Sequence, residues 1–485
     1  MLFNSISFAI FLPLVFVFYW FATRKKLSYQ NILLLGASYF FYASWDWRFL
    51  FLLIFSTVLD YVTGIKMYAS NTRSEKKFWF CLSIGINLAF LGFFKYYNFF
   101  IESFSEGLTL IGMQLNPWTL NIILPVGISF YTFHGLSYVI DIYNNKITPE
   151  RNFIDYSLFV SFFPLLVAGP IERATHLLPQ LKKSRDFNYG AAVNGMRQIL
   201  WGLFKKIVIA DNCATIANEV FGNYSTQNGP TLLLGAVLFS IQIYCDFSGY
   251  SDIAIGTARL FGIDLLRNFA FPYFSRDVAE FWRRWHISLS TWFRDYLYIP
   301  LGGSKVSDLK KIRNVFIIFL VSGFWHGANW TFLFWGFLNA LYILPSIIIK
   351  TNRVNLDIVA KGSYLPSVKD FFSMLITFGL TVFAWIFFRS ENITHAFNFI
   401  TRIFSEIYKH PGSILLSNFW LSNITILILI LFFFITEWVG REHSYAIQHF
   451  GYKISKPFRW SFYFLIVLSI FLFGGKQQAF IYFQF

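Results

Sequence analysis

A long uncharged run constrains this chain more than any other feature. From Val315 to Leu344 the sequence contains no aspartate, glutamate, lysine or arginine, and His326 is the one histidine in the run. Such a run is long enough to cross the hydrocarbon core of a bilayer as a helix. An ionisable group at membrane depth is costly, so His326 is a functional-site hypothesis by default. The alternative is a neutral core histidine bonded to Asn329 or to a backbone carbonyl.

The composition indicates a membrane protein with many spans rather than a soluble enzyme. Hydrophobic residues make up 56% of the 485 residues and charged residues only 13%, and the mean hydropathy is +0.52. The formal net charge of +15 would also suit nucleic acid. The basic residues, however, gather in short loops between apolar runs, as the positive-inside rule predicts. We therefore expect a membrane as partner and no nucleic acid.

These runs predict an all-α polytopic membrane protein with about eleven transmembrane helices, together with re-entrant and interfacial helices. Leu2–Ala22 is followed by basic residues, which predicts an uncleaved helix with its N-terminus outside. Proline and glycine interrupt the short run Tyr156–Ile171, which predicts a re-entrant segment. We find no repeat or soluble domain and expect one membrane-embedded domain over residues 1–485. Further helices are expected near 29–45, 48–65, 369–388, 419–438 and 459–475, and a loop near 101–120.

The cysteines are too few and too scattered for a disulfide framework or a metal site. Cys81, Cys213 and Cys245 lie far apart in the sequence. We expect three free thiols, no metal and no bound cofactor.

A second histidine, His286, lies in the arginine-rich stretch before the uncharged run. Residues 276–298 taken as one helix put an aromatic stripe on one face and polar side chains opposite, with His286 at the stripe's edge. This pattern is typical of a helix in the membrane interface, and equally of an amphipathic helix packed on other helices. The stripe is Trp282, Trp285, Leu289, Trp292 and Tyr296; the polar side is Arg284, Ser288, Thr291 and Asp295.

Other polar groups lie within apolar runs. We rank His134 below His326 because Asp141 and Tyr131 are plausible neutral partners for it. Asp246 and Asp252 belong to a polar cluster spaced by glycines. They either join helices by hydrogen bonds or orient His286 or His326, as carboxylates do for catalytic imidazoles.

Five stretches are long enough to be compared with known families: FWRRWHISLSTWFRDYLYIPLGGS, SGFWHGANWTFLFWG, LPVGISFYTFHGLSYVIDIY, FFPLLVAGPIERATHLLPQL and YCDFSGYSDIAIGTARLFGI. They resemble the membrane-bound O-acyltransferase family, specifically its bacterial branch containing alginate O-acetyltransferase. The resemblance covers nearly the whole chain and is loose only after Arg389. One departure is His134, where a glutamine is expected in this branch.

The resemblance implies a fold with a central funnel and a catalytic histidine deep in the membrane that matches His326, with His286 as the second histidine. It implies an acyl donor in the cytoplasm, either acetyl-coenzyme A or an acyl-carrier thioester. It further implies an exported or cell-envelope polysaccharide as acceptor and a separate periplasmic acetyltransferase as partner. The expected location is the bacterial inner membrane.

Acyl transfer to a hydroxyl needs a base, donors for the oxyanion and exclusion of water. We predict that His326 is the base, that Asn329 or a backbone N–H beside Gly327 stabilises the oxyanion, and that His286 positions the donor. The expected supporting residues are Trp325, Arg284, Asp246 and Asp252. No serine elbow or Cys-His arrangement is present, which favours direct transfer, with a histidine-bound acyl group as the alternative.

Other functions fit parts of this pattern. Within the family they are D-alanyl transfer to an envelope polymer and acylation of a lipid or protein. Outside it, a polytopic transporter also combines broken helices with intramembrane histidines.

Overall fold

The computed structural model describes residues 1–23, 26–113, 117–167, 169–409, 423–450, 455–474 and 477–483. Over these ranges the chain forms helices and turns and no strand, which confirms the all-α prediction. It divides into two compact units, Met1–Gly195 with Thr257–Leu266, and Met196–Gly256 with Arg267–Phe485. The single-domain prediction stays a prediction.

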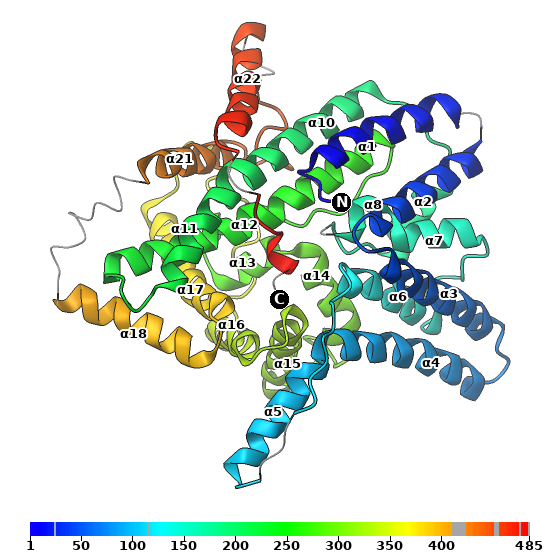
Figure 1. The fold of residues 1–485 in the computed structure, drawn as a ribbon, viewed down its shortest axis with the longest axis horizontal. Coiled ribbons are helices and arrows are strands. Elements are labelled where there is room, and N and C mark those ends of the chain that lie inside the picture. The colour runs from blue at the N-terminus through cyan, green and yellow to red at the C-terminus, as the bar shows by residue number, and fades with distance from the viewer. Residues whose placement is uncertain are drawn as a thin grey trace. The chain divides into compact units, whose positions relative to one another are not determined.

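The first unit holds the N-terminal helices (Figure 1). They are α1 (Ile6–Val17), η1 (Phe18–Ala22), α2 (Leu27–Ala43), α3 (Trp47–Ala69), α4 (Arg73–Leu91), η2 (Gly92–Tyr96), α5 (Tyr97–Leu110), α6 (Ile128–Tyr143), α7 (Phe153–Ser161), α8 (Phe163–Leu166), α9 (Ala174–Leu181) and the start of α10 (Tyr189–Leu203).

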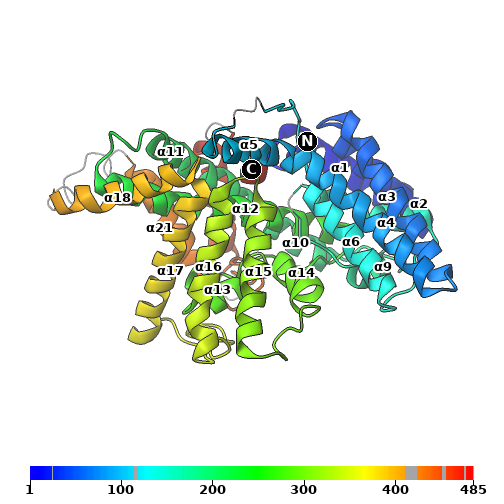
Figure 2. The same cartoon turned by 90° about the horizontal axis from the view of Figure 1, so that it is seen from below.

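A buried carboxyl group joins three of these helices. Asp60 of α3 accepts hydrogen bonds from Ser83 at 2.6 Å and from Asn87 at 2.8 Å, both on α4. Gly135 of α6 faces the same carboxyl, since a Cβ there would lie 1.9 Å from it. Helices α3, α4 and α6 accordingly pack side by side (Figures 1 and 2).

The second unit holds the remaining helices. They are η3 (Phe204–Ala210), α11 (Asp211–Gly222), most of α12 (Gly229–Leu260), η4 (Pro272–Phe274), α13 (Val278–Arg284), α14 (Ile287–Phe293), η5 (Arg294–Tyr298), α15 (Asp308–His326), α16 (Trp330–Ile348), α17 (Val368–Arg389), α18 (Ile393–Lys409), α21 (Ile424–Val439), α22 (Lys456–Leu472) and η6 (Ile481–Phe483).

Helices α15, α16 and α17 lie next to one another, as Figure 2 shows. Glycine makes the close contact between α15 and α16 possible. A Cβ on Gly323 would lie 2.3 Å from the carbonyl oxygen of Phe332, and a Cβ on Gly336 would lie 2.3 Å from that of Phe319. These two glycines therefore serve helix packing.

Within the described residues, five helical stretches are long and apolar enough to cross a membrane: Trp47–Ala69, Arg73–Leu110, Gly229–Leu260, Trp330–Ile348 and Val368–Arg389. Shorter apolar helices cover Ile6–Ala22, Phe153–Leu166 and Ile424–Val439. The chain is therefore multi-pass, whereas the count of about eleven spans stays a prediction.

Several helix predictions are confirmed near their expected bounds, notably those at 48–65 and 369–388, which lie within α3 and α17. The predicted helix at 419–438 begins outside the described residues. The predicted loop at 101–120 is wrong in its first half, because α5 continues to Leu110. The two glutamates in this region do not end the helix, because the residues around them are apolar. The helical stretch that begins with α4 therefore runs without interruption from Arg73 to Leu110.

Gly336→Ala should destabilise the protein by about 1–3 kcal/mol, because its methyl group would collide with the backbone of Phe319. The matched control is Gly379→Ala on α17, where a Cβ meets nothing within 4 Å. That change should be neutral or stabilise by up to about 1 kcal/mol through helix propensity. Thermal unfolding of both purified variants in detergent measures the difference; equal midpoints would contradict the packing argument.

Candidate active site

His326 is the last residue of α15 and is only 4% exposed. Aromatic rings surround it: its centroid lies 5.2 Å from Trp335, 5.3 Å from Phe388 and 4.8 Å from Trp325. Trp335 comes from α16 and Phe388 from α17, so all three neighbouring helices contribute to its surroundings.

His286 lies at a sharp break between α13 and α14. Its backbone has φ +42°, in the left-handed region that L side chains rarely adopt. The break is held by Asn268, whose carbonyl accepts from Ile287 N–H at 2.8 Å and whose side chain accepts from Ser288 at 2.6 Å. These bonds satisfy the start of α14 and leave the His286 ring buried, at 1% exposure.

The prediction of one amphipathic helix over residues 276–298 is therefore wrong. The aromatic stripe is real but packs inside the protein, since Trp285 is 1% exposed and Leu289 3% exposed. Trp285 contacts Trp385 of α17 with ring centroids 5.1 Å apart. The alternative of packing on other helices is the correct one, and 100° periodicity fails here because the helix restarts at Ile287.

His286 and His326 both have ring contacts with Trp325. The Trp325 ring is 4.8 Å from that of His326 and 6.1 Å from that of His286. Phe247 of α12 covers His286 at 4.6 Å. Neither ring nitrogen of His286 has a hydrogen-bond partner among the described residues. A buried polar group without a partner is costly, so it calls for an explanation such as a ligand.

The residue that sequence reasoning missed is Tyr482. Its ring lies 5.6 Å from that of His326, 6.3 Å from that of Trp325 and 4.7 Å from that of Phe247. We call Phe247, His286, Trp325, His326 and Tyr482 the histidine cluster. The only sequence signal for Tyr482 was the aromatic stretch AFIYFQF, which follows α22.

The carboxylates Asp246 and Asp252 face lysines instead of histidines. Asp246 lies 2.7 Å from Lys206, and Asp252 lies 2.6 Å from Lys205. Neither carboxylate bonds either histidine among the described residues. The hypothesis that one of them orients an imidazole gains no support from these contacts.

Asn329 is the N-cap of α16. Its side-chain oxygen accepts from Thr331 N–H at 3.0 Å, and its Nδ2 donates to the carbonyl of Glu391 at 2.7 Å. The side chain thus has structural partners at both ends. Its role toward an oxyanion stays a prediction, as does that of the backbone beside Gly327.

Arg284 belongs to an ionic group at the end of α13. It bonds Glu280 at 2.7 Å and the carbonyl of Asp357 at 2.8 Å. Arg276 bonds both of these residues, and its guanidinium lowers the pKa of the exposed Asp357 carboxyl. Arg284 also lines a cavity of about 410 Å³ together with Arg267, Arg441 and His443.

His134 belongs to the first unit and is fully buried. Its Nε2 accepts a hydrogen bond from the backbone N–H of Glu172 at 3.1 Å. Its Nδ1 has no hydrogen-bond partner among the described residues, so the prediction of a satisfied core histidine holds at one ring nitrogen only. The partners named were wrong, since Asp141 pairs with Lys146 at 3.4 Å.

Cys81, Cys213 and Cys245 are free. No cluster of histidine, cysteine, aspartate and glutamate with metal-binding geometry occurs in the part of the chain that the structure describes.

Comparison with known proteins now identifies the family. The model of the membrane-bound O-acyltransferase family matches residues 144–388, which include both histidines. The chain belongs to the membrane-bound O-acyltransferase family. It is therefore a multi-pass membrane O-acyltransferase.

Three relatives illustrate the range of this family. The chain is 40% identical to a probable alginate O-acetylase of Pseudomonas aeruginosa, over 84% of this chain and 75% of that protein. It is 37% identical to a peptidoglycan O-acetyltransferase of Helicobacter pylori, over 82% of this chain and 78% of the relative. It is 29% identical to a teichoic acid D-alanyltransferase of Streptococcus thermophilus, over 60% of this chain and 75% of the relative.

Two substitutions at His286 separate the effect of its left-handed backbone on stability from the effect of losing its imidazole ring. His286→Gly and His286→Ala both remove the imidazole, but only glycine adopts φ +42° without strain. The glycine variant should be the more stable of the two by about 1 kcal/mol. Thermal unfolding in detergent measures this difference. Equal stability, or a more stable alanine variant, would contradict the left-handed conformation.

Proposed function

We propose that this acyltransferase moves an acetyl group from a cytoplasmic thioester through the membrane for O-acetylation of an exported or cell-envelope polysaccharide. The observation that carries the proposal is the histidine cluster, in which two buried imidazoles lie against one tryptophan. The similarity to alginate and peptidoglycan O-acetylating relatives supports the acetyl group and the polysaccharide.

In the proposed reaction His326 is the base. Its neutral imidazole removes the proton of the acceptor's hydroxyl group while the oxygen of that group attacks the thioester carbonyl. The tetrahedral oxyanion then collapses, the carbon–sulfur bond breaks, and the thiolate leaves and takes up the proton. His286, with no hydrogen-bond partner for its ring among the described residues, holds the donor through one ring nitrogen. The aromatic surroundings of His326 exclude water, so the thioester is not hydrolysed.

The charge of one cavity supports the proposal that the donor is anionic. A cavity of about 730 Å³ lies beside α13, α14, α15 and α16. Its walls combine cations with an apolar side formed by the two long helices, and Asp308 is its acidic residue. The cationic residues are Arg283, Arg294, Lys311, Lys350 and Arg353, and the apolar ones include Val315, Ile318, Ile343 and Ile347.

The position of this cavity constrains the shape of the donor. Lys311 in its wall and His326 lie fifteen residues apart on α15, which is about 22 Å along the helix axis. A donor whose phosphates bind these cations therefore reaches His326 only through a long flexible arm. Phosphopantetheine thioesters, which include acetyl-coenzyme A and acyl-carrier thioesters, have such an arm.

The remaining parts of the proposal follow from the same reaction. The basic loops at the cavity support a location on the cytoplasmic side of the bacterial inner membrane by the positive-inside rule. The acceptor is on the opposite side, and a separate periplasmic acetyltransferase completes the transfer to the polysaccharide. Trp325, Arg284, Asp246 and Asp252 act as supporting residues around this path.

The first experiment measures ester-linked acetate on envelope and secreted polysaccharide in the wild type, a deletion strain and strains carrying His326→Ala or His326→Gln. Loss of a general base should lower acetylation by about 10²–10⁴-fold. The control is His395→Ala, because that ring stacks on Tyr224 at 4.6 Å instead of on Trp325. Protein levels in the membrane are measured for each variant.

Two results would overturn the assignment. Normal acetate in both His326 variants would exclude the histidine as base. Normal acetate in the deletion strain would exclude polysaccharide acetylation and direct attention to D-alanyl transfer, to lipid or protein acylation, or to transport.

The donor cavity gives a separate prediction. Lys350→Gln with Arg353→Gln removes two cations from the cavity wall without touching the histidine cluster. The Michaelis constant for acetyl-coenzyme A should rise by about tenfold or more, with little change in kcat, because binding away from the reacting atoms is lost. Initial rates of the purified protein at varied donor concentration measure this effect. An unchanged Michaelis constant would place the donor elsewhere.

A further inference from the structure

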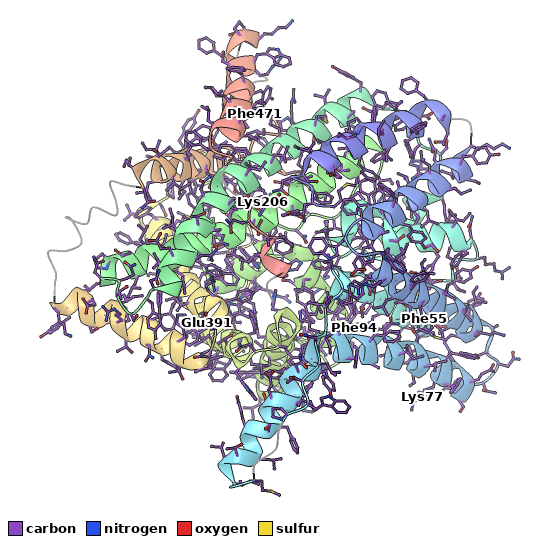
Figure 3. The ribbon with its side chains drawn as sticks, viewed as in Figure 1. Phe55, Lys77, Phe94, Lys206, Glu391 and Phe471 are labelled. Carbon is purple, nitrogen blue, oxygen red and sulfur yellow. The ribbon has the colours of Figure 1, made fainter. Side chains whose placement is uncertain are left out.

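A buried lysine in the second unit bonds three separate parts of the chain. Lys206 lies in η3, is 1% exposed and is labelled in Figure 3. Its ammonium group is 2.7 Å from Asp211 and 2.7 Å from Asp246, and it donates to the carbonyl oxygen of Gln478 at 3.2 Å. The ammonium group thus forms ion pairs with two carboxylates and donates one hydrogen bond, to the carbonyl of Gln478. We call Lys206, Asp211 and Asp246 the lysine clasp.

Two side chains of the clasp bond the backbone of residues 477–483. Lys206 donates to the carbonyl of Gln478. Asp246 accepts from the backbone N–H of Ile481 at 2.7 Å. The segment is therefore held by its main chain at two points three residues apart.

The held segment carries side chains into the histidine cluster. Phe480 and Ile481 are fully buried, and the Phe480 ring lies 4.4 Å from Tyr250. Tyr482 follows directly, with its ring 5.6 Å from that of His326. The bond from Ile481 N–H to the clasp thus lies one residue from the side chain that contacts His326.

We propose that Lys206, Asp211 and Asp246 are positioning residues, which hold residues 477–483 so that Tyr482 forms one wall of the histidine cluster. The inference rests on the proposed function of His326 and extends it to residues that do not touch the substrate. Asp246 accordingly acts on the site through the chain segment it binds and not by orienting an imidazole.

A role in stability alone does not account for this arrangement. A buried ion pair is weak evidence for stability, because desolvation of the charges offsets their attraction. Its clearest benefit is to select one arrangement among alternatives. In the clasp, Lys206 and Asp246 pair with each other, and each also makes a hydrogen bond to the main chain of residues 477–483.

The neighbouring lysine supplies a matched control. Lys205 is equally buried, at 3% exposure, and bonds Asp252 at 2.6 Å and Ser248 at 3.0 Å. Its polar contacts in the described chain lead to α12 and not to residues 477–483. Lys205→Met and Lys206→Met thus remove the same buried charge from adjacent positions, and only the second opens the clasp.

The first test is crosslinking in the full-length membrane protein. The photoreactive residue p-benzoylphenylalanine replaces Tyr482, and mass spectrometry measures its crosslink to the α15 peptide that contains Trp325 and His326. The crosslink should form in the otherwise wild-type protein and in Lys205→Met. In Lys206→Met it should fall by about 10²-fold, the effect of removing one partner of a buried pair.

Ile481→Pro is a second variant that leaves the buried charges in place. It removes the N–H group from which Asp246 accepts, together with the buried isoleucine side chain, and it fixes the backbone φ at this residue. The crosslink should fall in this variant as well, with insertion and elution volume unchanged. A crosslink that persists in Lys206→Met or in Ile481→Pro would overturn the clasp, as would its loss in Lys205→Met.

The second test measures acyl transfer. A chain that stops after Ala479 lacks the wall but keeps the clasp, and it should lose activity by about 10²-fold, as misplaced catalytic groups do. Adding Lys206→Met to this shortened chain should cause no further loss, because the clasp acts through the missing segment. Additive losses would overturn the proposal. The crosslink needs no acyl transfer, so it tests the clasp even where the proposed function fails.

Discussion

The candidate site depends on the two hydrogen bonds that Asn268 makes to the start of α14. These bonds give Ile287 N–H and the Ser288 hydroxyl an acceptor at the point where the helix is interrupted. The two bonds compensate for helical hydrogen bonds that are lost at the break. At the break His286 has a left-handed backbone conformation. One buried asparagine thus determines that His286 lies on Trp325 next to His326.

The second requirement is that charged groups near the cluster be neutralised by one another. Lys205 pairs with Asp252 and Lys206 with Asp246. The two aspartates of the polar cluster on α12 thus neutralise two consecutive lysines. The histidines are left with aromatic neighbours. The proposed reaction requires a neutral imidazole at His326, which is the state that a general base needs.

Much of this was accessible from the sequence. Charge distribution and apolar runs predicted an all-helical membrane protein, and the uncharged run indicated His326 as a candidate, which the structure surrounds with aromatic rings. Two features were not accessible. The break at His286 depends on Asn268, which lies in a loop, and helical periodicity carries no information about such a partner. Tyr482 meets His326 across more than 150 residues, and no local pattern in AFIYFQF names its partner.

The lysine clasp also has a consequence for biosynthesis. Lys206 and Asp246 are made and inserted long before Gln478 and Ile481 leave the ribosome. Until then one N–H donor of the lysine and one carboxylate oxygen lack their main-chain partners, and Tyr482 does not yet cover His326. The histidine cluster is thus completed only when residues 477–483 have been made. A truncated chain would carry both histidines in the membrane with the cluster open on one side.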